Sequence, residues 1–212
     1  TNITFPAAAA QTYTNTGDAK ASTAANWTTR IPLVGIDDVT IGATITYDMP
    51  RMGKSISVTA GTFTKSVEIN IYGSFTLASG VTYTSTTNGE NLTGRGAYTL
   101  TTNGKVLRQP NILFGANITL GSSLTSSSTS GFGIVGSFND AGFSVTTARV
   151  VINTSGTPTI TKSGTWTLDA IAAVSKWTTT SVTGLTFIDT GTTILTNSGA
   201  NAQTFAGGGL TY

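Results

Sequence analysis

The chain has 212 residues, of which 38% are apolar and only 9% are charged, and its net charge at pH 7 is +2. It contains no Cys and no His, which excludes a disulfide framework, thiolate chemistry, zinc knuckles and histidine acid–base catalysis. The eleven basic residues are scattered, and no apolar run approaches the ~18 to 20 residues of a bilayer-spanning helix, so neither nucleic-acid binding nor membrane insertion is expected.

The composition predicts an all-β protein. About one residue in five is Thr, and Thr, Val and Ile are stiff at χ1 and favour extended backbone. Residues 1–30 contain an Ala run and little alternation, so they are predicted to form an irregular N-terminal arm or cap that ends near Trp27. Residues 31–212 are predicted to form one repetitive β-domain.

Apolar residues at every second position are the main secondary-structure signal after residue 38. This period of two is typical of half-buried strands. The best candidate for a helix is the short segment Leu168–Val174, which is long enough for one or two turns. The alternating positions include Val39, Ile41, Ala43 and Ile45, then Ile56 and Val58, then Val67, Ile69 and Ile71.

A loose internal repeat favours one β architecture over another. Segments of the form Gly-x-(aromatic or apolar)-Thr-Leu occur at 73–77, 96–100, 115–120 and 164–168, and several follow one another at intervals of 20 to 25 residues. A period of this length matches one coil of a parallel β-helix, in which short strands stack on those of the next coil. Asn88-Gly89 and Asn103-Gly104 are also hairpin signals, so an antiparallel β-sandwich stays open as the alternative.

Acidic residues are the natural candidates for chemistry in a chain without His, because glycosidases use paired carboxylates. Asp37-Asp38 is the only adjacent pair, and its position after Gly35 predicts a turn whose side chains hold backbone N–H groups. No catalytic, cofactor-binding or metal site is predicted, and no cofactor. The other acids stand alone and could cluster only through the fold: Asp18, Asp48, Glu68, Glu90, Asp140, Asp169 and Asp189.

Glycine and aromatic residues are assigned structural roles. The run 207–209 is followed by Leu210, which fits neither a calcium repeat nor a phosphate loop, so a turn is predicted. Trp27, Trp166 and Trp177 are predicted to be core or cap residues rather than a sugar-stacking surface. The more exposed aromatic residues are expected to be Tyr47, Tyr72, Tyr83 and Tyr98.

Three stretches resemble β-solenoid structural proteins of tailed bacteriophages. Residues 26–41, NWTTRIPLVGIDDVTI, resemble an opening found in secreted and virion β-solenoids. Residues 71–80 (IYGSFTLASG) and 94–105 (GRGAYTLTTNGK) look like the following coils. Residues 163–168 (SGTWTL) and 204–212 (TFAGGGLTY) are similar to a repeat of large phage structural proteins, in which the latter segment continues into a further strand. The resemblance therefore implies that 31–212 belongs to a longer chain.

The resemblance implies a non-enzymatic virion protein, a tail fibre, tail-tip or capsid-surface component that lies on the virion surface or tail. Its expected partners are other virion proteins, copies of itself in a trimer, and a glycan or protein of the host surface. The alternative is a bacterial secreted adhesin or extracellular filament subunit at the cell surface, in which residues 1–6 add a strand to a neighbour. A polysaccharide-degrading tailspike is less favoured, because acids are scarce.

Overall fold

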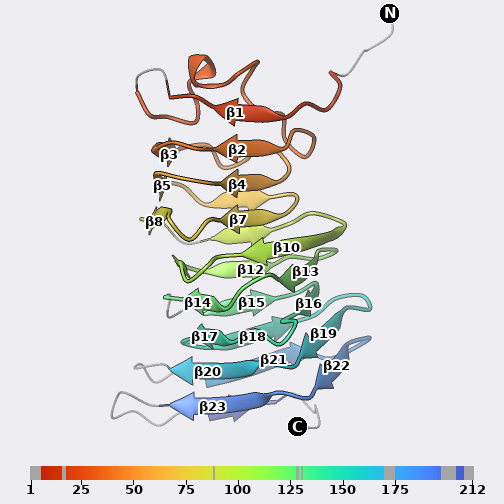
Figure 1. Cartoon of the computed structure of the whole chain (residues 1–212). Coiled ribbons are helices and arrows are strands. Elements are labelled where there is room, and N and C mark those ends of the chain that lie inside the picture. The colour runs from red at the N-terminus through yellow and green to blue at the C-terminus, as the bar shows by residue number, and fades with distance from the viewer. Residues whose placement is uncertain are drawn as a thin grey trace, which may run out of the picture.

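The computed structural model describes residues 6–15, 18–87, 89–127, 129, 131–169, 175–196 and 204–207. Within these residues the chain consists of short strands and one 3-10 turn, η1 (Ala24–Asn26), and every pairing between named strands is parallel. Successive coils stack along one axis into a β-solenoid (Figure 1). The predicted parallel β-helix is therefore confirmed, and the antiparallel sandwich is excluded.

Three strands make up most coils, and each belongs to a different sheet. Sheet A contains nine strands: β1 (Gln11–Tyr13), β2 (Val39–Ile41), β4 (Ile56–Val58), β7 (Phe75–Leu77), β10 (Ala97–Thr101), β13 (Asn117–Leu120), β16 (Ser137–Asn139), β19 (Thr159–Lys162) and β22 (Thr186–Asp189). Sheet C contains β6 (Ile69–Ile71), β9 (Glu90–Leu92), β12 (Pro110–Ile112), β15 (Phe132–Ile134), β18 (Val150–Asn153), β21 (Ser175–Ser181) and β24 (Thr204–Ala206).

The third side of the solenoid changes part-way along the axis. Its N-terminal part is sheet B, made of β3 (Ile45–Tyr47), β5 (Thr62–Lys65) and β8 (Thr82–Ser85). Its C-terminal part is sheet D, made of β11 (Val106–Leu107), β14 (Leu124–Ser126), β17 (Val145–Thr147), β20 (Thr165–Asp169) and β23 (Thr192–Thr196). Sheets A and C continue past this change, so they carry the axial continuity of the molecule.

The core is a set of apolar columns inside the coils. On sheet A the register places Val39, Ile56, Phe75, Leu100 and Leu120 in consecutive coils, one above the other, and all five are buried. Each such side chain contributes roughly 1.5–3 kcal/mol by leaving water. The residues between them point outward and are mostly Thr and Ser, which tolerate a solvated sheet face.

The coils differ in length, which explains why the repeat is loose in the sequence. Paired residues of sheet A lie 17 residues apart from Val39 to Ile56 and 27 apart from Ile160 to Phe187. The repeated Gly-x-x-Thr-Leu segments also fall on different sheets: the first three lead into β7, β10 and β13, and the fourth into β20. The glycine is needed at the corner, since a Cβ at Gly164 would overlap the carbonyl oxygen of Phe143.

Residues 6–15 and 18–30 lie against the first coil. Strand β1 is not irregular, because it pairs with β2 and extends sheet A (Gln11 beside Val39). The buried Trp27 packs edge-on against Tyr13, with ring centroids 5.2 Å apart, and its indole N–H donates to the Ala21 carbonyl oxygen at 2.9 Å. These contacts cover the core at this end.

The helical turn expected at Leu168–Val174 is not formed in its described part. Leu168 and Asp169 belong to β20, which pairs with β17 and β23. Leu168 is buried inside the solenoid, so its strand position is favoured by the neighbouring coils. Residues 170–174 lie outside the described residues.

Ala141 is strained and offers a first test of the fold. Its φ is +50° and it precedes Gly142, whereas the comparable turn at 103–104 has Asn at φ +47°. Left-handed backbone costs Ala about 1 kcal/mol and Asn less. Ala141→Asn is therefore expected to raise the melting temperature by about 2–4 °C in circular dichroism. The matched control Ala97→Asn, on strand β10, should give no gain, and an unchanged Ala141→Asn would contradict the strain argument.

Candidate functional site

The Asp37-Asp38 pair has the predicted turn role. The buried Asp37 carboxylate accepts hydrogen bonds from the backbone N–H groups of Ala9 and Leu33, both at 2.8 Å, and lies 2.9 Å from the Arg30 guanidinium. Burial alone would raise the pKa of Asp37, but these partners outweigh it and hold the pKa below its ordinary value. Asp38 is exposed and accepts one backbone hydrogen bond at 3.3 Å. The pair therefore anchors a turn.

Asp140 is the most heavily bonded acid. Its buried carboxylate accepts from the backbone N–H and hydroxyl of Ser163 at 2.9 and 2.7 Å, and from the N–H groups of Gly164 and Gly142 at 3.0 Å. The Trp166 indole N–H also donates, at 2.8 Å. Burial would raise the pKa of Asp140, but the hydrogen bonds from Ser163, Gly164 and Gly142 lower it overall. This acid joins two coils.

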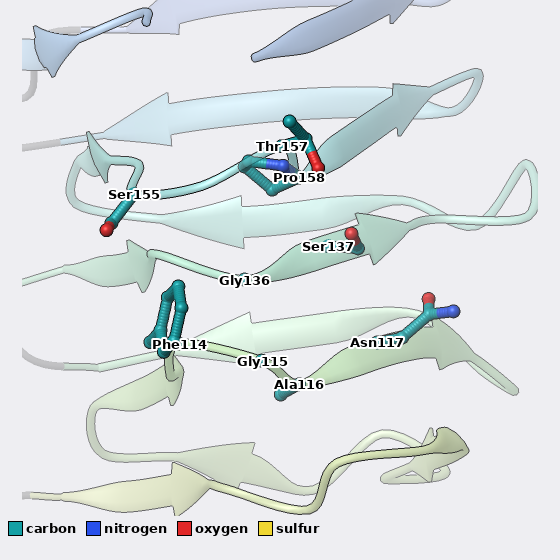
Figure 2. Close-up of a pocket in the computed structure, with 9 residues that line it drawn as sticks. All are labelled: Phe114, Gly115, Ala116, Asn117, Gly136, Ser137, Ser155, Thr157 and Pro158. Carbon is teal, nitrogen blue, oxygen red and sulfur yellow. The ribbon is translucent and has the colours of Figure 1, made fainter. Parts of the chain in front are cut away.

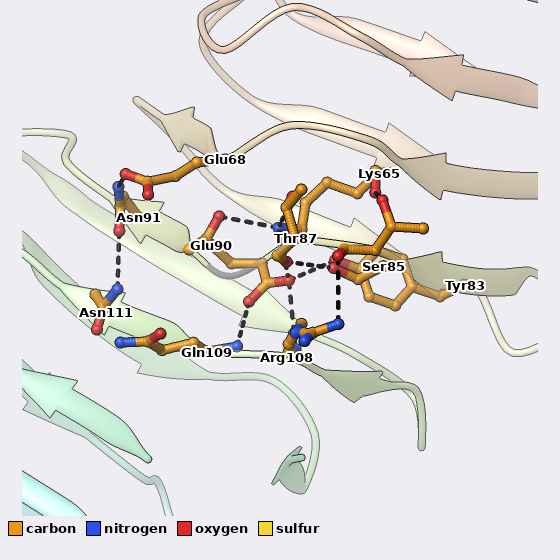
Figure 3. Close-up of polar contacts among 12 residues, drawn as sticks. Lys65, Glu68, Tyr83, Ser85, Thr87, Glu90, Asn91, Arg108, Gln109 and Asn111 are labelled. Atoms are coloured by element: carbon orange, nitrogen blue, oxygen red, sulfur yellow. Dashed lines mark hydrogen bonds and ion pairs between the residues drawn. The ribbon is translucent and has the colours of Figure 1, made fainter. Parts of the chain in front are cut away.

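Lys65 and Glu90 form a buried ion pair between sheets B and C (Figure 3). Both side chains are fully buried, and Lys65 Nζ lies 3.4 Å from Glu90 Oε1. The ammonium also donates to the carbonyl oxygens of Thr87 and Gly89, at 2.7 and 3.2 Å. Burial lowers the pKa of Lys65 by more than the Glu90 carboxylate raises it.

The Glu90 carboxylate has further donors from its own coil and from the next one. It accepts from the Tyr83 hydroxyl at 2.7 Å and from the backbone N–H of Gln109 at 2.8 Å (Figure 3). Burial and the nearby carboxylate raise the pKa of Tyr83, which keeps its hydroxyl protonated and donating. The nearby Glu68 lies outside, where it accepts from the Asn91 amide at 2.6 Å. Glu68 and Glu90 are thus brought close together, but each is held by its own partners.

The remaining acids also contact their own surroundings. Asp18 accepts from Thr23 and Asn26, and Asp48 accepts from Ser22. Asp189 forms an ion pair with the buried Lys162, with 2.8 Å between Nζ and Oδ1. Asp169 is exposed at the end of β20. No group of three or more potential metal-ligating side chains occurs among the described residues.

The aromatic predictions are confirmed in part. Trp27, Trp166 and Trp177 are all buried, as predicted for structural residues. Tyr47 was expected to be exposed, and this is wrong: it is fully buried, and its hydroxyl donates to the Met52 carbonyl oxygen at 3.1 Å. Its position two residues after the inward Ile45 explains this, since both belong to one strand face. Half-buried positions are occupied by Tyr72, Tyr83 and Tyr98. In the run 207–209, only Gly207 lies within the described residues.

One aromatic residue that projects from the solenoid was not predicted from the sequence. Phe114, in the loop between β12 and β13, is 57% exposed. Alternation from the inward Ile112 would place it inside, but the strand ends at Ile112 and the chain turns through Gly115 at φ +81°. In Figure 2 the Phe114 ring extends toward the coil that carries Ser155. In the sequence, the only sign of this position is that Phe114 directly precedes Gly115, a residue that favours a turn.

Phe114 borders a hollow of about 200 Å³, whose lining includes Phe114, Asn117, Gly136, Ser137, Ser155 and Thr157 (Figure 2). Gly136 lies where two coils approach closely, since a Cβ there would overlap the Leu113 carbonyl oxygen. A second hollow of about 320 Å³ adjoins the first and shares Asn117 and Ser137 with it. Besides Phe138, whose ring is buried in the core, its lining consists of Asn117, Thr119, Ser137, Asn139, Thr159 and Thr161. We call the two together the A-face groove.

Two rows of polar side chains run across this groove. The register places Thr119, Asn139 and Thr161 side by side on β13, β16 and β19. The second row begins with Asn117 beside Ser137. Adjacent strands lie about 4.8 Å apart and same-face residues along a strand about 6.6 Å apart, so the backbone fixes the spacing of these groups.

The hydrogen-bonding capacity of the groove is largely free. Within the part of the chain that the structure describes, the side chains of Asn117, Thr119 and Thr161 make no hydrogen bond, whereas Asn139 accepts from a backbone N–H at 2.8 Å. The outward amides of sheet C are different, because the Asn111 amide donates to its neighbour in the adjoining coil at 2.9 Å. The lining of the groove contains no charged side chain. The arrangement can bind a neutral polar ligand beside an exposed ring.

No helix among the described residues is long and apolar enough to cross a membrane.

Comparisons with known proteins give no further assignment. Neither the family models, nor the curated proteins, nor the solved structures contain a match to this chain.

Proposed function

We propose that the protein is a non-enzymatic structural component of a tailed-phage particle, a tail fibre, tail-tip or capsid-surface protein, with a role in recognising the host surface. The observation that carries this proposal is the continuous parallel ladder of sheet A, in which each coil is hydrogen-bonded to the next from β1 to β22. Such a ladder makes a stiff rod that presents its loops at fixed positions. The likeness of residues 26–41, 71–80 and 94–105 to phage β-solenoids supplies the phage context.

The positions of the acids support a structural role. General acid–base catalysis needs a carboxyl group that exchanges protons with a substrate. Asp37, Glu90 and Asp140 are buried instead, and they hold backbone N–H groups of their own and adjoining coils. We therefore propose that the carboxylates of this chain join coils rather than hydrolyse a bond. Release of reducing ends from host polysaccharide by the purified protein would contradict this and favour a depolymerase.

Location is tested by immunogold electron microscopy. An antibody raised against the purified chain is applied to a lysate that contains both cells and virus particles. We expect label on tails or capsids, and the labelled part identifies the component. Label confined to the cell envelope or to free filaments would overturn the phage proposal in favour of a bacterial adhesin or filament subunit.

Self-association is part of the same proposal. Three copies of a β-solenoid placed side by side would cover exposed apolar side chains, such as Ile188 and Ile194 near the last described coils. Sedimentation equilibrium of the purified chain is expected to give three times the mass of the monomer. A monomer at all concentrations would contradict the trimer while leaving the location to be decided by microscopy.

A further inference from the structure

We propose that the A-face groove is a binding site for a neutral polysaccharide chain of a cell surface, in which a sugar ring packs on Phe114 and its hydroxyl groups bond the two polar rows. This inference rests on the recognition role proposed above and names its ligand class. Four kinds of observation carry it: the exposure of one ring, the free hydrogen-bonding groups, the absence of charge in the lining, and the rigidity of the strands.

The aromatic contact comes from Phe114. Several other Phe rings, including Phe75 and Phe132, are fully buried in the solenoid, whereas Phe114 is directed away from it beside a hollow. Two coils further along, a Cβ at Gly156 would lie 3.3 Å from Phe114 Cε2, so the glycine places no side chain against this edge of the ring. The C–H face of a pyranose is apolar and flat, which matches the face of an aromatic ring.

The polar rows supply the matching hydrogen-bonding groups. Each sugar hydroxyl both donates and accepts, and the same is true of the Thr hydroxyl and the Asn amide. Asn117, Thr119 and Thr161 are unbonded to described residues and so need not break a contact to receive a ligand. Their strands are locked into sheet A, so binding needs no ordering of the backbone that carries them.

The charge of the groove selects against anionic ligands. A nucleic acid or acidic polysaccharide would need several cations along its path. The lining has none, and the nearby Arg95 lies beside Gly115 at the edge of the first hollow. A neutral chain avoids the cost of leaving an anionic group without a partner.

The extent of the groove predicts weak binding per site. It crosses three strands, which is about 10 Å along the axis at ~4.8 Å per strand, so it holds a short segment of a chain. Multivalent display on one particle would convert such contacts into stable attachment. Binding should therefore be measured with polymers rather than with single sugars.

The experiment is native affinity electrophoresis of the purified chain toward the cathode, in gels containing dextran, yeast mannan, galactan or, for comparison, the acidic polymer alginate. We expect one or more neutral polymers to retard the protein. Phe114→Ala and Asn117→Ala should each weaken that retardation about tenfold, which corresponds to 1.4 kcal/mol. Phe114→Tyr should keep it. All variants are first matched to the parent chain by circular dichroism and melting temperature.

Two control variants share the chemistry but lie outside the groove. Phe143→Ala removes another exposed ring, and Thr40→Val removes an outward hydroxyl of sheet A on β2. Neither should change the retardation. Equal losses from control and groove variants would overturn the assignment of the site, as would the absence of retardation in all neutral gels. Retardation by alginate alone, lost with salt or with Arg95→Ala, would replace the neutral ligand by an anionic one.

The electrophoresis test of the groove and the microscopy test of the proposed function can fail independently of each other. Gold label on virus particles without retardation in neutral gels overturns the glycan groove alone. Groove-dependent retardation with label confined to the cell envelope overturns the phage location alone.

Discussion

Replacement of Asp140 by Asn is expected to lower the free energy of unfolding by about 4 kcal/mol, near the upper end for single substitutions. The variant loses the charge from a buried carboxylate that accepts from Ser163, Gly164, Gly142 and the Trp166 indole. In the variant an amide NH2 group replaces one carboxylate oxygen. This group is a donor and cannot accept hydrogen bonds from the N–H groups that it faces. Urea unfolding followed by circular dichroism measures the loss.

The location of the damage provides a second readout. Each coil of a solenoid contacts mainly its neighbours, so opening should begin near the altered coil. Hydrogen exchange in Asp140→Asn is expected to rise in β17 and β20 and to stay unchanged in β2. The control Asp38→Asn alters an exposed acid with a single 3.3 Å contact and should change stability by less than about 0.5 kcal/mol. A similar loss in both variants would refute the special role of Asp140.

The same carboxylate predicts a pH dependence. The pKa of Asp140 is lower in the folded state than in the unfolded state, where it is about 3.9. Its contribution to the free energy of unfolding is therefore present above about pH 3.9 and is lost as the pH falls through the folded-state pKa. The parent chain should therefore lose stability below about pH 4. Asp140→Asn should lose less over that range, so the two stability curves converge in acid. Asp37, which also has a lowered pKa, supplies the acid sensitivity that the variant keeps.

The buried pair of Lys65 and Glu90 gives the second large effect. Glu90→Gln is expected to cost about 3–5 kcal/mol, because it leaves the Lys65 ammonium fully buried without its carboxylate. The double variant Lys65→Met with Glu90→Gln removes the stranded charge. The Gln amide oxygen can still accept from the Gln109 N–H, and its NH2 can donate to the Tyr83 hydroxyl, which then acts as the acceptor.

The double variant should therefore recover most of the loss, in a double-mutant cycle measured by urea unfolding. A coupling energy of about 2–3 kcal/mol is expected. Additive losses from the two single substitutions would mean that the ion pair contributes little beyond its separate hydrogen bonds to Thr87 and Gln109.

Local patterns explain how much of the fold could be predicted. The alternation at Val39, Ile41 and Ile45 correctly assigns the inward face, because side chains of a strand point to opposite sides in turn. The same rule places Tyr47 inside, so its expected exposure was wrong. The Asp37 turn was also predictable, because its hydrogen bonds to Leu33 are local.

The candidate site could not be predicted in this way. Phe114 leaves the alternation at a turn, and its surroundings come from Ser137 and Ser155 in the next coils. The burial of Lys65 likewise depends on Glu90, 25 residues later in the chain. Because the spacing of paired residues along sheet A varies between 17 and 28 residues, the sequence contains no constant period from which such neighbours could be counted.

Strand parity and residue type in the sequence establish short β-strands with apolar inward faces and Thr-rich outward faces, and the loose repeat favours stacked coils over the antiparallel sandwich that stayed open. Which residues of different coils contact one another is known only from the tertiary structure. The reason is that contacts along the axis depend on the length of every intervening loop. The A-face groove and the joints at Asp140 and Glu90 are made of such contacts.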